Sequence, residues 1–345
     1  MTETYSTVDY HTGGEPFRIV TAGAPDIPGA TVAERRMNAI DDDVIQRTRK
    51  VLCSEPRGHA DMYGGFLTPP DDDGADFGVL FWHKDGFSTA CGHGTIALGV
   101  WAVESGRVSA DPDGSTDVVI DVPSGRVTAR VTCLGGQVES VAFVNVPSWV
   151  VARDVPVATL RGDLSVDVSF GGAIYASLPA SAVGLSVTPE DYPELIRIGR
   201  EIKHLLNSHE VARHPDDERL SGIYGTILYD DFSADGVVHQ RNVTVFADGE
   251  VDRSPCGSGT CARLALLTDA GTLAPGEQLV HDSIVGSRFL GRVLSGGRAQ
   301  AGAATTDARV AEPVIPEVVG MAYRTGESTF SVDPRDSITP GFVLR

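Results

Sequence analysis

The chain has 345 residues, of which 41% are hydrophobic and 22% charged, the composition of a soluble globular protein with one large or two ordinary domains. Its formal net charge of −19 argues against nucleic acid and anionic membranes as partners. The sequence contains no apolar run of about 18 residues, and Met1–Ser6 lacks the basic start of a secretory signal. We therefore expect a cytoplasmic protein without a membrane span.

Three stretches predict secondary structure, taken in chain order. The first is a helix over Thr31–Leu52, in which apolar residues recur between charged ones. The second is a β-meander over Val118–Val151, broken by turn residues near positions 123–125 and 135–136. The third is a helix that begins at Thr188-Pro189-Glu190, where Thr suits the cap and Pro suits the first turn. Its apolar positions at helical spacing are Leu195, Ile198, Ile202 and Leu205.

An internal repeat is the most informative feature of the sequence. The segments Cys91–Thr95 and Cys256–Thr260 both read Cys-Gly-x-Gly-Thr, and they lie 256 − 91 = 165 residues apart. Each opens a run of small and apolar residues that ends at a glycine, which predicts a buried helix. A period this long indicates two similar domains. We place them at residues 1–150 and 151–320, with residues 321–345 crossing back to the first domain.

The repeat also predicts a chemistry. A cysteine at a helix N-terminus lies among unpaired N–H groups and the positive end of the helix dipole, so its thiol should ionise more readily than usual. The same N–H groups, at Gly92, His93, Gly257 and Ser258, suit a substrate carboxylate. If the two domains face each other, Cys91 and Cys256 can act as an acid/base pair on opposite faces of one carbon. Because the chain has no signature of a nucleotide or metal site, we expect no cofactor and no metal.

The other cysteines, Cys53, Cys133 and Cys261, are interpreted as core or strand residues. The odd count of five, without C-x-x-C spacing, argues against a disulfide framework or a structural zinc site. The plain alternative for Cys91 and Cys256 is also burial as structural residues, but their matching five-residue settings argue against it. A disulfide between these two is interpreted as an oxidation product.

These motifs resemble the proline racemase family, which includes proline racemases, 4-hydroxyproline 2-epimerases and trans-3-hydroxy-L-proline dehydratases. The resemblance spans nearly the whole chain and rests on Asp9–Pro16, Glu55–Gly64, Cys91–Thr95, Gly171-Gly172 and Asp252–Thr260. It implies an α+β fold of two pseudo-symmetric domains, each a β-sheet layer wrapped around a central helix, as in diaminopimelate epimerase. It further implies an active site in the cleft between the domains, a small amino-acid or imino-acid substrate, and a homodimer without metal.

The resemblance also assigns roles. It implies that Cys91 and Cys256 are the acid/base residues and that Asp252 binds the substrate amine. Tyr63 and Phe246 correspond to aromatic residues that line the pyrrolidine pocket. It also implies that the substrate carboxylate is bound by Gly92, His93, Gly257 and Ser258. A capping role for Asp252 is compatible with amine binding. A Cys91–His93 nucleophilic pair is disfavoured, because residues two apart on a helix do not face each other.

Three functions compete at this point. The family's dehydratases usually carry Thr where this chain has Cys256, so a second thiol favours a racemase or epimerase acting at Cα of proline or hydroxyproline. The enzymic alternative is a trans-3-hydroxy-L-proline dehydratase that gives a pyrroline carboxylate. The non-enzymic alternative is a binding or redox protein. Ala90 stands where the family most often has Met, which leaves the choice of substrate open.

Overall fold

The computed structural model describes residues 3–294 and 312–344. By its internal contacts the chain divides into two compact units. Unit 1 comprises residues 1–141 and 321–345, and unit 2 comprises residues 142–320. We describe each unit by itself.

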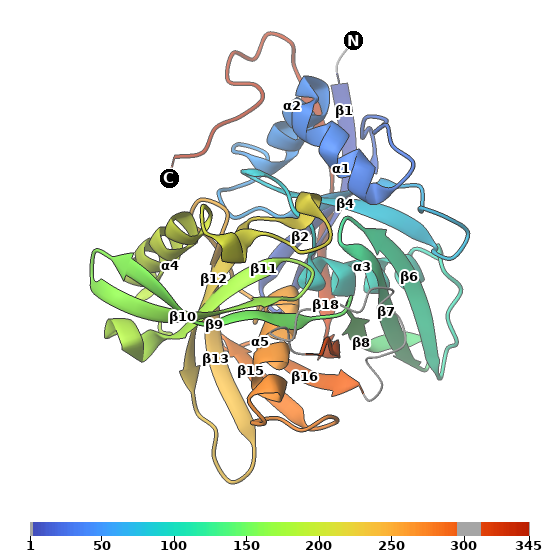
Figure 1. Ribbon diagram of the computed structural model, residues 1–345. Helices are drawn as coiled ribbons and strands as arrows, with labels where there is room; N and C mark the ends of the chain where they lie inside the picture. Colours follow the sequence, from blue (N-terminus) through green and yellow to red (C-terminus); the bar gives the residue numbers. More distant parts are fainter. Residues whose placement is uncertain (1–2, 295–311, 345) are drawn as a thin grey trace. The chain divides into compact units, whose positions relative to one another are not determined.

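Unit 1 is a mixed β-sheet with one buried helix, α3, against its concave side (Figure 1). Along the sheet, β18 pairs with β1, β1 with β2, β2 with β3, β3 with β4, β4 with β6, and β6 with β7. Helix α3 contacts β1, β2, β6, β7 and β18, while α1 and α2 pack against β4. The elements of unit 1 are β1 (Glu3–Thr12), β2 (Glu15–Ala22), α1 (Val32–Asp41), α2 (Asp43–Cys53), β3 (Gly64–Thr68), β4 (Phe77–His83), β5 (Gly86–Phe87), α3 (Gly92–Glu104), β6 (Ser115–Val122), β7 (Gly125–Leu134) and β18 (Ala322–Val332), and β8 (Gln137–Val144) runs across the boundary to unit 2.

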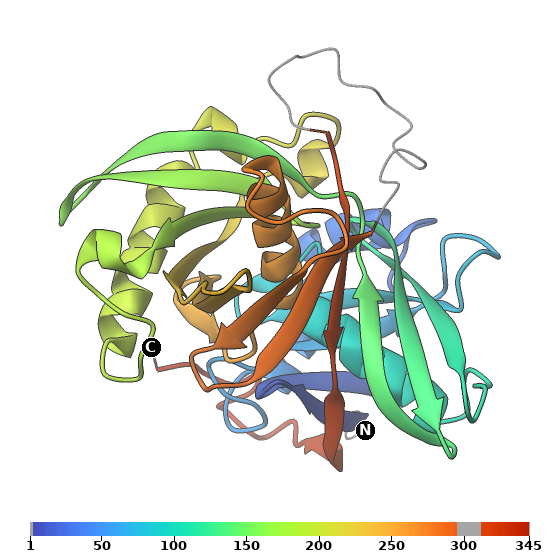
Figure 2. The same ribbon diagram turned by 90° about the horizontal axis from the view of Figure 1, so that it is seen from below.

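Unit 2 repeats this plan around helix α5. Figure 2 shows α5 lying between strands of the unit, and it contacts β9, β10, β11, β16 and β17. Helix α4 packs against β12 and β13. The elements of unit 2 are β9 (Trp149–Thr159), β10 (Gly162–Phe170), β11 (Ile174–Pro179), η1 (Ala180–Val183), α4 (Tyr192–Leu206), η2 (Glu210–Ala212), η3 (Glu218–Leu220), β12 (Ile223–Asp231), β13 (Val238–Phe246), β14 (Glu250–Asp252), α5 (Gly257–Asp269), β15 (Gln278–Ser283), β16 (Arg288–Leu294) and β17 (Ile315–Gly320).

The two units have the same strand pairing in the same order. In unit 1, β1 is antiparallel to β2, β2 parallel to β3, β3 antiparallel to β4, and β4 parallel to β6. In unit 2, β10 is antiparallel to β11, β11 parallel to β12, β12 antiparallel to β13, and β13 parallel to β15. The predicted α+β fold, in which each unit wraps a sheet around a central helix, is therefore confirmed.

Both central helices begin and end as the sequence predicts. Cys91 is the N-cap of α3 and Cys256 is the N-cap of α5. The helices end just before Gly106 and Gly271, whose φ values of 71° and 68° lie in the left-handed region that favours glycine. Nearly every residue of both helices is buried, because each helix contacts strands on several sides.

Two of the predicted helices differ from the structure. The stretch Thr31–Leu52 is two helices, α1 and α2, because the backbone of Asp42 is extended and its carboxylate caps the second helix. Asp42 Oδ1 accepts hydrogen bonds from the N–H groups of Val44 and Ile45 at 2.8 and 2.9 Å. Helix α4 begins at Tyr192 rather than at Thr188, and its N-cap is Asp191.

The predicted meander corresponds to most of β6, to β7 and β8, and to the first residues of β9, with turns at the expected positions. Within the described ranges, no helix combines the length and the apolar character needed to cross a lipid bilayer.

Candidate active site

In unit 1 the thiol of Cys91 lies at the start of α3 in a regular extended backbone, with φ −155° and ψ 100°. Its Sγ accepts a hydrogen bond from the N–H of Gly94 at 3.2 Å. Thr95 Oγ1 donates to the Cys91 carbonyl at 2.8 Å. The Cys-Gly-x-Gly-Thr sequence therefore folds the sulfur back over the first turn of the helix.

In unit 2 the motif repeats one of these local contacts around Cys256. Thr260 Oγ1 donates to the Cys256 carbonyl at 2.7 Å, whereas the Cys256 side chain makes no capping hydrogen bond to α5. The backbone of Cys256 differs, however, because its φ is 63° and its ψ is 105°. A positive φ is uncommon for a residue other than glycine.

The second glycine of each motif leaves the space that the sulfur occupies. A Cβ on Gly94 would lie 2.7 Å from Cys91 Sγ and 2.4 Å from the ring of Phe17. A Cβ on Gly259 would lie 2.9 Å from Cys256 Sγ. All three separations are shorter than ordinary contacts, so this glycine is a requirement of the thiol turn.

The structure corrects one expectation for Cys256, which was expected to ionise readily. Burial raises its pKa well above the ordinary thiol value, and the nearby carboxylate of Asp252 raises it further. The nearby N–H of Gly259 and the hydroxyl of Thr244 lower the pKa of Cys256 but do not offset burial. Cys256 is therefore a protonated thiol near neutral pH.

Asp252 is connected to Cys256 by hydrogen bonds through Ser254. Its Oδ1 accepts from the N–H and the hydroxyl of Ser254 at 2.8 and 2.6 Å, and Ser254 Oγ accepts from the N–H of Cys256 at 3.0 Å. Asp252 is buried and does not cap α5, whose N-cap is Cys256 itself. The predicted capping role is therefore wrong, and the carboxylate instead orders the turn that leads to the thiol.

His93 is in contact with Cys91, contrary to the expectation that residues two apart do not face each other. Cys91 Sγ lies 3.6 Å from His93 Nδ1 and 3.5 Å from Nε2. The expectation failed because Cys91 is a cap residue with extended backbone and does not follow helix geometry. Nearly equal distances to both ring nitrogens mean that the sulfur does not point along either nitrogen's hydrogen-bonding direction, unlike a nucleophile and its base.

Tyr63 completes the group around Cys91. Its ring packs edge-on against His93, with centroids 4.9 Å apart, and its hydroxyl is hydrogen-bonded to Ser88 Oγ. Tyr63, Cys91, Gly92 and His93 are all buried in unit 1. The structure thus brings these four predicted site residues together.

Phe246 belongs to an aromatic row in unit 2. Its ring stacks on Tyr224 at 5.6 Å, and Tyr224 packs edge-on against Tyr175, also at 5.6 Å. The Tyr175 hydroxyl is 2.7 Å from Ser258 Oγ and 3.9 Å from Cys256 Sγ. This row connects the predicted ring-binding residue Phe246 to the predicted carboxylate-binding residue Ser258.

Sequence reasoning missed Tyr175, although a second repeat could have found it. Gly13-Gly14 is followed three residues later by Phe17, and Gly171-Gly172 is followed three residues later by Tyr175. Phe17 packs against His93 with centroids 5.9 Å apart, as Tyr175 contacts Ser258. The two aromatic residues thus contact the equivalent position of the two thiol motifs.

The first-turn N–H groups predicted to hold a carboxylate are at the expected places. Gly92 and His93 open α3, and Gly257 and Ser258 open α5. N–H groups at these positions have no acceptor within their own helix. In unit 2, Gly171 approaches this turn so closely that a Cβ there would lie 2.4 Å from the Ser258 carbonyl oxygen.

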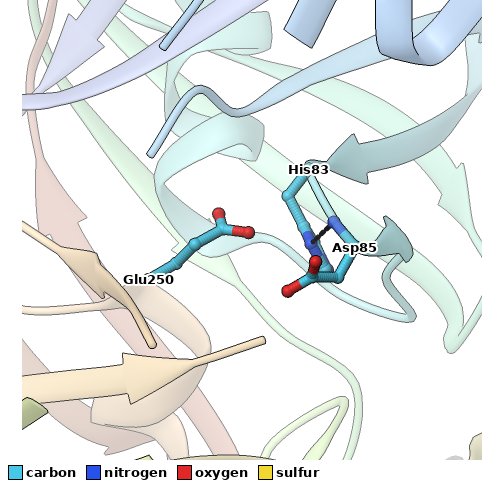
Figure 3. A group of neighbouring side chains, drawn as sticks. All are labelled: His83, Asp85 and Glu250. Carbon is cyan, nitrogen blue, oxygen red and sulfur yellow. Dashed lines mark hydrogen bonds between the residues drawn. The ribbon is translucent and has the colours of Figure 1, made fainter. Parts of the chain in front are cut away.

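Each thiol turn follows a short strand that pairs with the strand before it. In unit 1, β5 pairs with β4, which ends at His83, and Asp85 in the turn between them donates its N–H to His83 Nδ1 at 3.2 Å (Figure 3). In unit 2, β14 pairs with β13 and begins at the buried Glu250. These short pairings fix where the chain leaves the sheet and enters the thiol turn.

Comparison with known proteins gives the chain a family. The family described as proline racemase matches residues 7–343. The chain belongs to the proline racemase family. A trans-3-hydroxy-L-proline dehydratase of Bacillus cereus is 43% identical over 344 residues, covering 100% of this chain and 99% of the relative. A 3-hydroxyproline 2-epimerase of Burkholderia multivorans is 44% identical over 346 residues, with the same coverage.

A solved hydroxyproline epimerase has the same fold. The crystal structure of a hydroxyproline epimerase from Agrobacterium vitis, with bound trans-4-hydroxy-L-proline, matches with a TM-score of 0.89 and 31% identity. The match covers 99% of this chain and 96% of that chain. The resemblance stated from the motifs is thus confirmed, and the chain is an enzyme of a family whose named activities include epimerases and dehydratases.

Proposed function

We propose that the enzyme inverts the α-carbon of proline or hydroxyproline without a cofactor, using Cys91 and Cys256 as an acid/base pair. One observation carries this proposal: each unit places a cysteine thiol at the N-cap of its central buried helix, in topologically equivalent positions. A dehydration needs one base at Cα, whereas inversion needs a group on each face of the carbon. The second thiol, Cys256, therefore favours inversion.

The proposed mechanism starts with the substrate carboxylate on the first-turn N–H groups of α3 and α5, which suit an anion. One sulfur removes the α-proton as a thiolate, and the negative charge that spreads into the carboxylate is stabilised by the same N–H groups. The other sulfur, as a thiol, returns a proton to the opposite face. The raised pKa of Cys256 supports a resting state in which it is the proton donor and Cys91 is the base. The reverse reaction exchanges these roles.

The remaining roles extend this proposal. Asp252 would bind the ring ammonium through its carboxylate, a role that its buried position beside Cys256 supports. Tyr63 and Phe246 would contact the pyrrolidine ring. From the family resemblance we also expect a cytoplasmic homodimer that takes no metal or cofactor.

A second candidate is dehydration of trans-3-hydroxy-L-proline to a pyrroline carboxylate. It is favoured by the full-length similarity to the Bacillus cereus enzyme named for that reaction. In this scheme one thiol removes the α-proton, and the Tyr175–Ser258 pair beside Cys256 would assist the departing hydroxyl.

An NMR experiment in D2O separates the candidates. The enzyme is incubated with L-proline, trans-4-hydroxy-L-proline and trans-3-hydroxy-L-proline in turn. Deuterium at Cα together with a new stereoisomer is the result expected for inversion, and an imine product would instead establish dehydration. Absence of both exchange and product with all three substrates would overturn both candidates.

Substitution of the second thiol tests the mechanism. Cys256→Ser should lower the rate of inversion at least about a hundredfold, because a serine hydroxyl is a far poorer proton carrier than a thiol at neutral pH. The rate is measured by polarimetry or chiral chromatography. Cys261→Ser, five residues on and buried in the core, is the matched control and should retain turnover. Wild-type turnover in Cys256→Ser would contradict the two-thiol mechanism.

A further inference from the structure

The two thiols differ in the backbone that carries them. Cys91 has φ −155°, an extended conformation that any residue adopts, whereas Cys256 has φ 63° and ψ 105°. A non-glycine residue persists in such a conformation only when its surroundings hold it there. The structure must therefore contain groups that hold the backbone on both sides of Cys256.

The peptide plane before Cys256 is held by two hydrogen bonds. Asn242 Nδ2 donates to the Pro255 carbonyl at 3.0 Å, and the N–H of Cys256 donates to Ser254 Oγ at 3.0 Å. The plane after Cys256 is held at its carbonyl, which accepts from Thr260 Oγ1 at 2.7 Å. Because φ and ψ describe rotation of these two planes about Cα, anchoring both planes sets both angles.

His281 on β15 connects the two anchors. Its side chain is fully buried, with Nε2 2.9 Å from Asn242 Nδ2 and Nδ1 2.8 Å from Thr260 Oγ1. Because Asn242 Nδ2 already donates to a carbonyl, it is a donor toward His281, so Nε2 accepts and Nδ1 carries the proton. Nδ1–H then donates to Thr260 Oγ1, which leaves the threonine hydroxyl to donate to Cys256.

This chain of hydrogen bonds requires a neutral imidazole, and the surroundings of His281 favour the neutral form. Burial lowers the pKa of His281 to about 3, and the buried guanidinium of Arg263 lowers it as well. A protonated ring would carry a second donor that faces the Asn242 amide donor. The neutral ring is therefore the form that satisfies both neighbours.

Unit 1 has no imidazole at the equivalent place. Ile120 pairs with Phe77 in the parallel ladder of β4 and β6, as His281 pairs with Gln240 in the ladder of β13 and β15. Both residues are buried, and each precedes a buried aspartate, Asp121 or Asp282. His281 thus lies in the unit whose thiol, Cys256, has a positive φ. The unit whose thiol, Cys91, has an extended backbone carries the apolar Ile120 instead.

We propose that His281 is a positioning residue that holds the backbone of Cys256 through Asn242 and Thr260, and thereby aims this thiol alone. The expected effect of His281 on the rate of inversion rests on the proposed function, whereas its effect on the backbone of Cys256 does not depend on any substrate. His281 does not touch the reacting atoms, so its effect on the reaction passes through Cys256.

The kinetic test uses His281→Ile, which installs the side chain found at the equivalent place in unit 1. In D2O, the rate of inversion should fall at least about tenfold, because a small displacement of a reacting group costs this much or more. For the one enantiomer whose α-proton faces Cys91, the rate of deuterium exchange without inversion should stay within about twofold of the wild-type rate. A residue with only a general structural role would lower both rates together. His239→Gln, on the neighbouring strand, is the control and should leave both rates unchanged.

A second measurement needs no substrate. Alkylation of Cys91 and Cys256 by iodoacetamide is followed separately by peptide mass spectrometry over a range of pH. His281→Ile should change the rate and the pH midpoint for Cys256 and leave those of Cys91 unaltered. If wild-type enzyme turns over none of the three substrates, the proposed function fails while this measurement still decides the role of His281.

A milder pair of variants covers the case in which His281→Ile does not fold. Thr260→Val removes the hydroxyl between His281 and Cys256, and Thr95→Val removes its counterpart in unit 1. We expect Thr260→Val to alter alkylation of Cys256 several-fold more than Thr95→Val alters that of Cys91. Equal effects of the two substitutions, or unchanged Cys256 alkylation in Thr260→Val, would overturn the inference.

Discussion

At the scale of single residues, the space beside each sulfur determines which side chains can replace the second glycine of the thiol motif. Glycine inside a helix is ordinarily unfavourable, and replacing it by alanine stabilises a helix by roughly 1 kcal/mol. At Gly94 and Gly259 that gain is opposed by overlap of the new Cβ with the sulfur of Cys91 or Cys256. Because the overlap at Gly94 also involves the buried Phe17 ring, steric overlap outweighs helix propensity there.

Alanine at these glycines should therefore impair the reaction. Gly94→Ala and Gly259→Ala are each expected to lower turnover about tenfold or more by displacing the thiol, and Gly94→Ala should also lower the melting temperature. Turnover is measured by chiral chromatography and melting by circular dichroism. Gly326→Ala in β18, where a Cβ would meet nothing within 4 Å, serves as the control. Wild-type turnover in both thiol-motif variants would contradict this account.

At the scale of elements, local signals predict some boundaries and miss others. The ends of α3 and α5 were predictable because cysteine at the start and glycine at the end fit helix-capping geometry. The break between α1 and α2 was not, because Asp42 lies inside a continuous apolar period and acts through a carboxylate that accepts from the N–H groups of the turn that follows it. Tyr175 and His281 were missed for a related reason: their partners lie on elements distant in sequence.

The cap at Asp42 can be measured on its own. Asp42→Ala removes the acceptor for two N–H groups of α2 and should lower the free energy of unfolding by about 1 kcal/mol. Asp41→Ala, at the exposed end of α1, should change it much less. Urea denaturation followed by circular dichroism gives both values, and equal losses in the two variants would show that Asp42 contributes no cap.

At the scale of the whole molecule, the buried His281 links stability to pH. Its pKa is about 3 in the folded protein and near the ordinary value of about 6.5 when unfolded. The neutral ring therefore contributes stability that is fully present above pH of about 6.5 and is lost as the pH falls toward 3. Between these values the unfolded chain binds a proton that the folded chain does not.

Acidification should accordingly weaken the wild-type fold more than that of His281→Ile. From pH 7.5 to pH 4.5 this one group should remove about 2 to 3 kcal/mol from the free energy of unfolding. Other groups titrate in the same range, so the measured quantity is the difference between the two proteins in urea denaturation at both pH values. Parallel losses in the two proteins would contradict a neutral, buried His281.

The pairing of β1 with β18 has a consequence for the order in which the protein is made. Residues Glu3–Thr12 leave the ribosome before the other described strands, and their antiparallel partner in β18, Ala322–Val332, leaves after all of them. All strands of unit 2 emerge in between, so that unit can complete its hydrogen-bonding ladder earlier. The sheet of unit 1 is therefore completed after that of unit 2, and one edge of β1 stays unpaired until β18 has been synthesised.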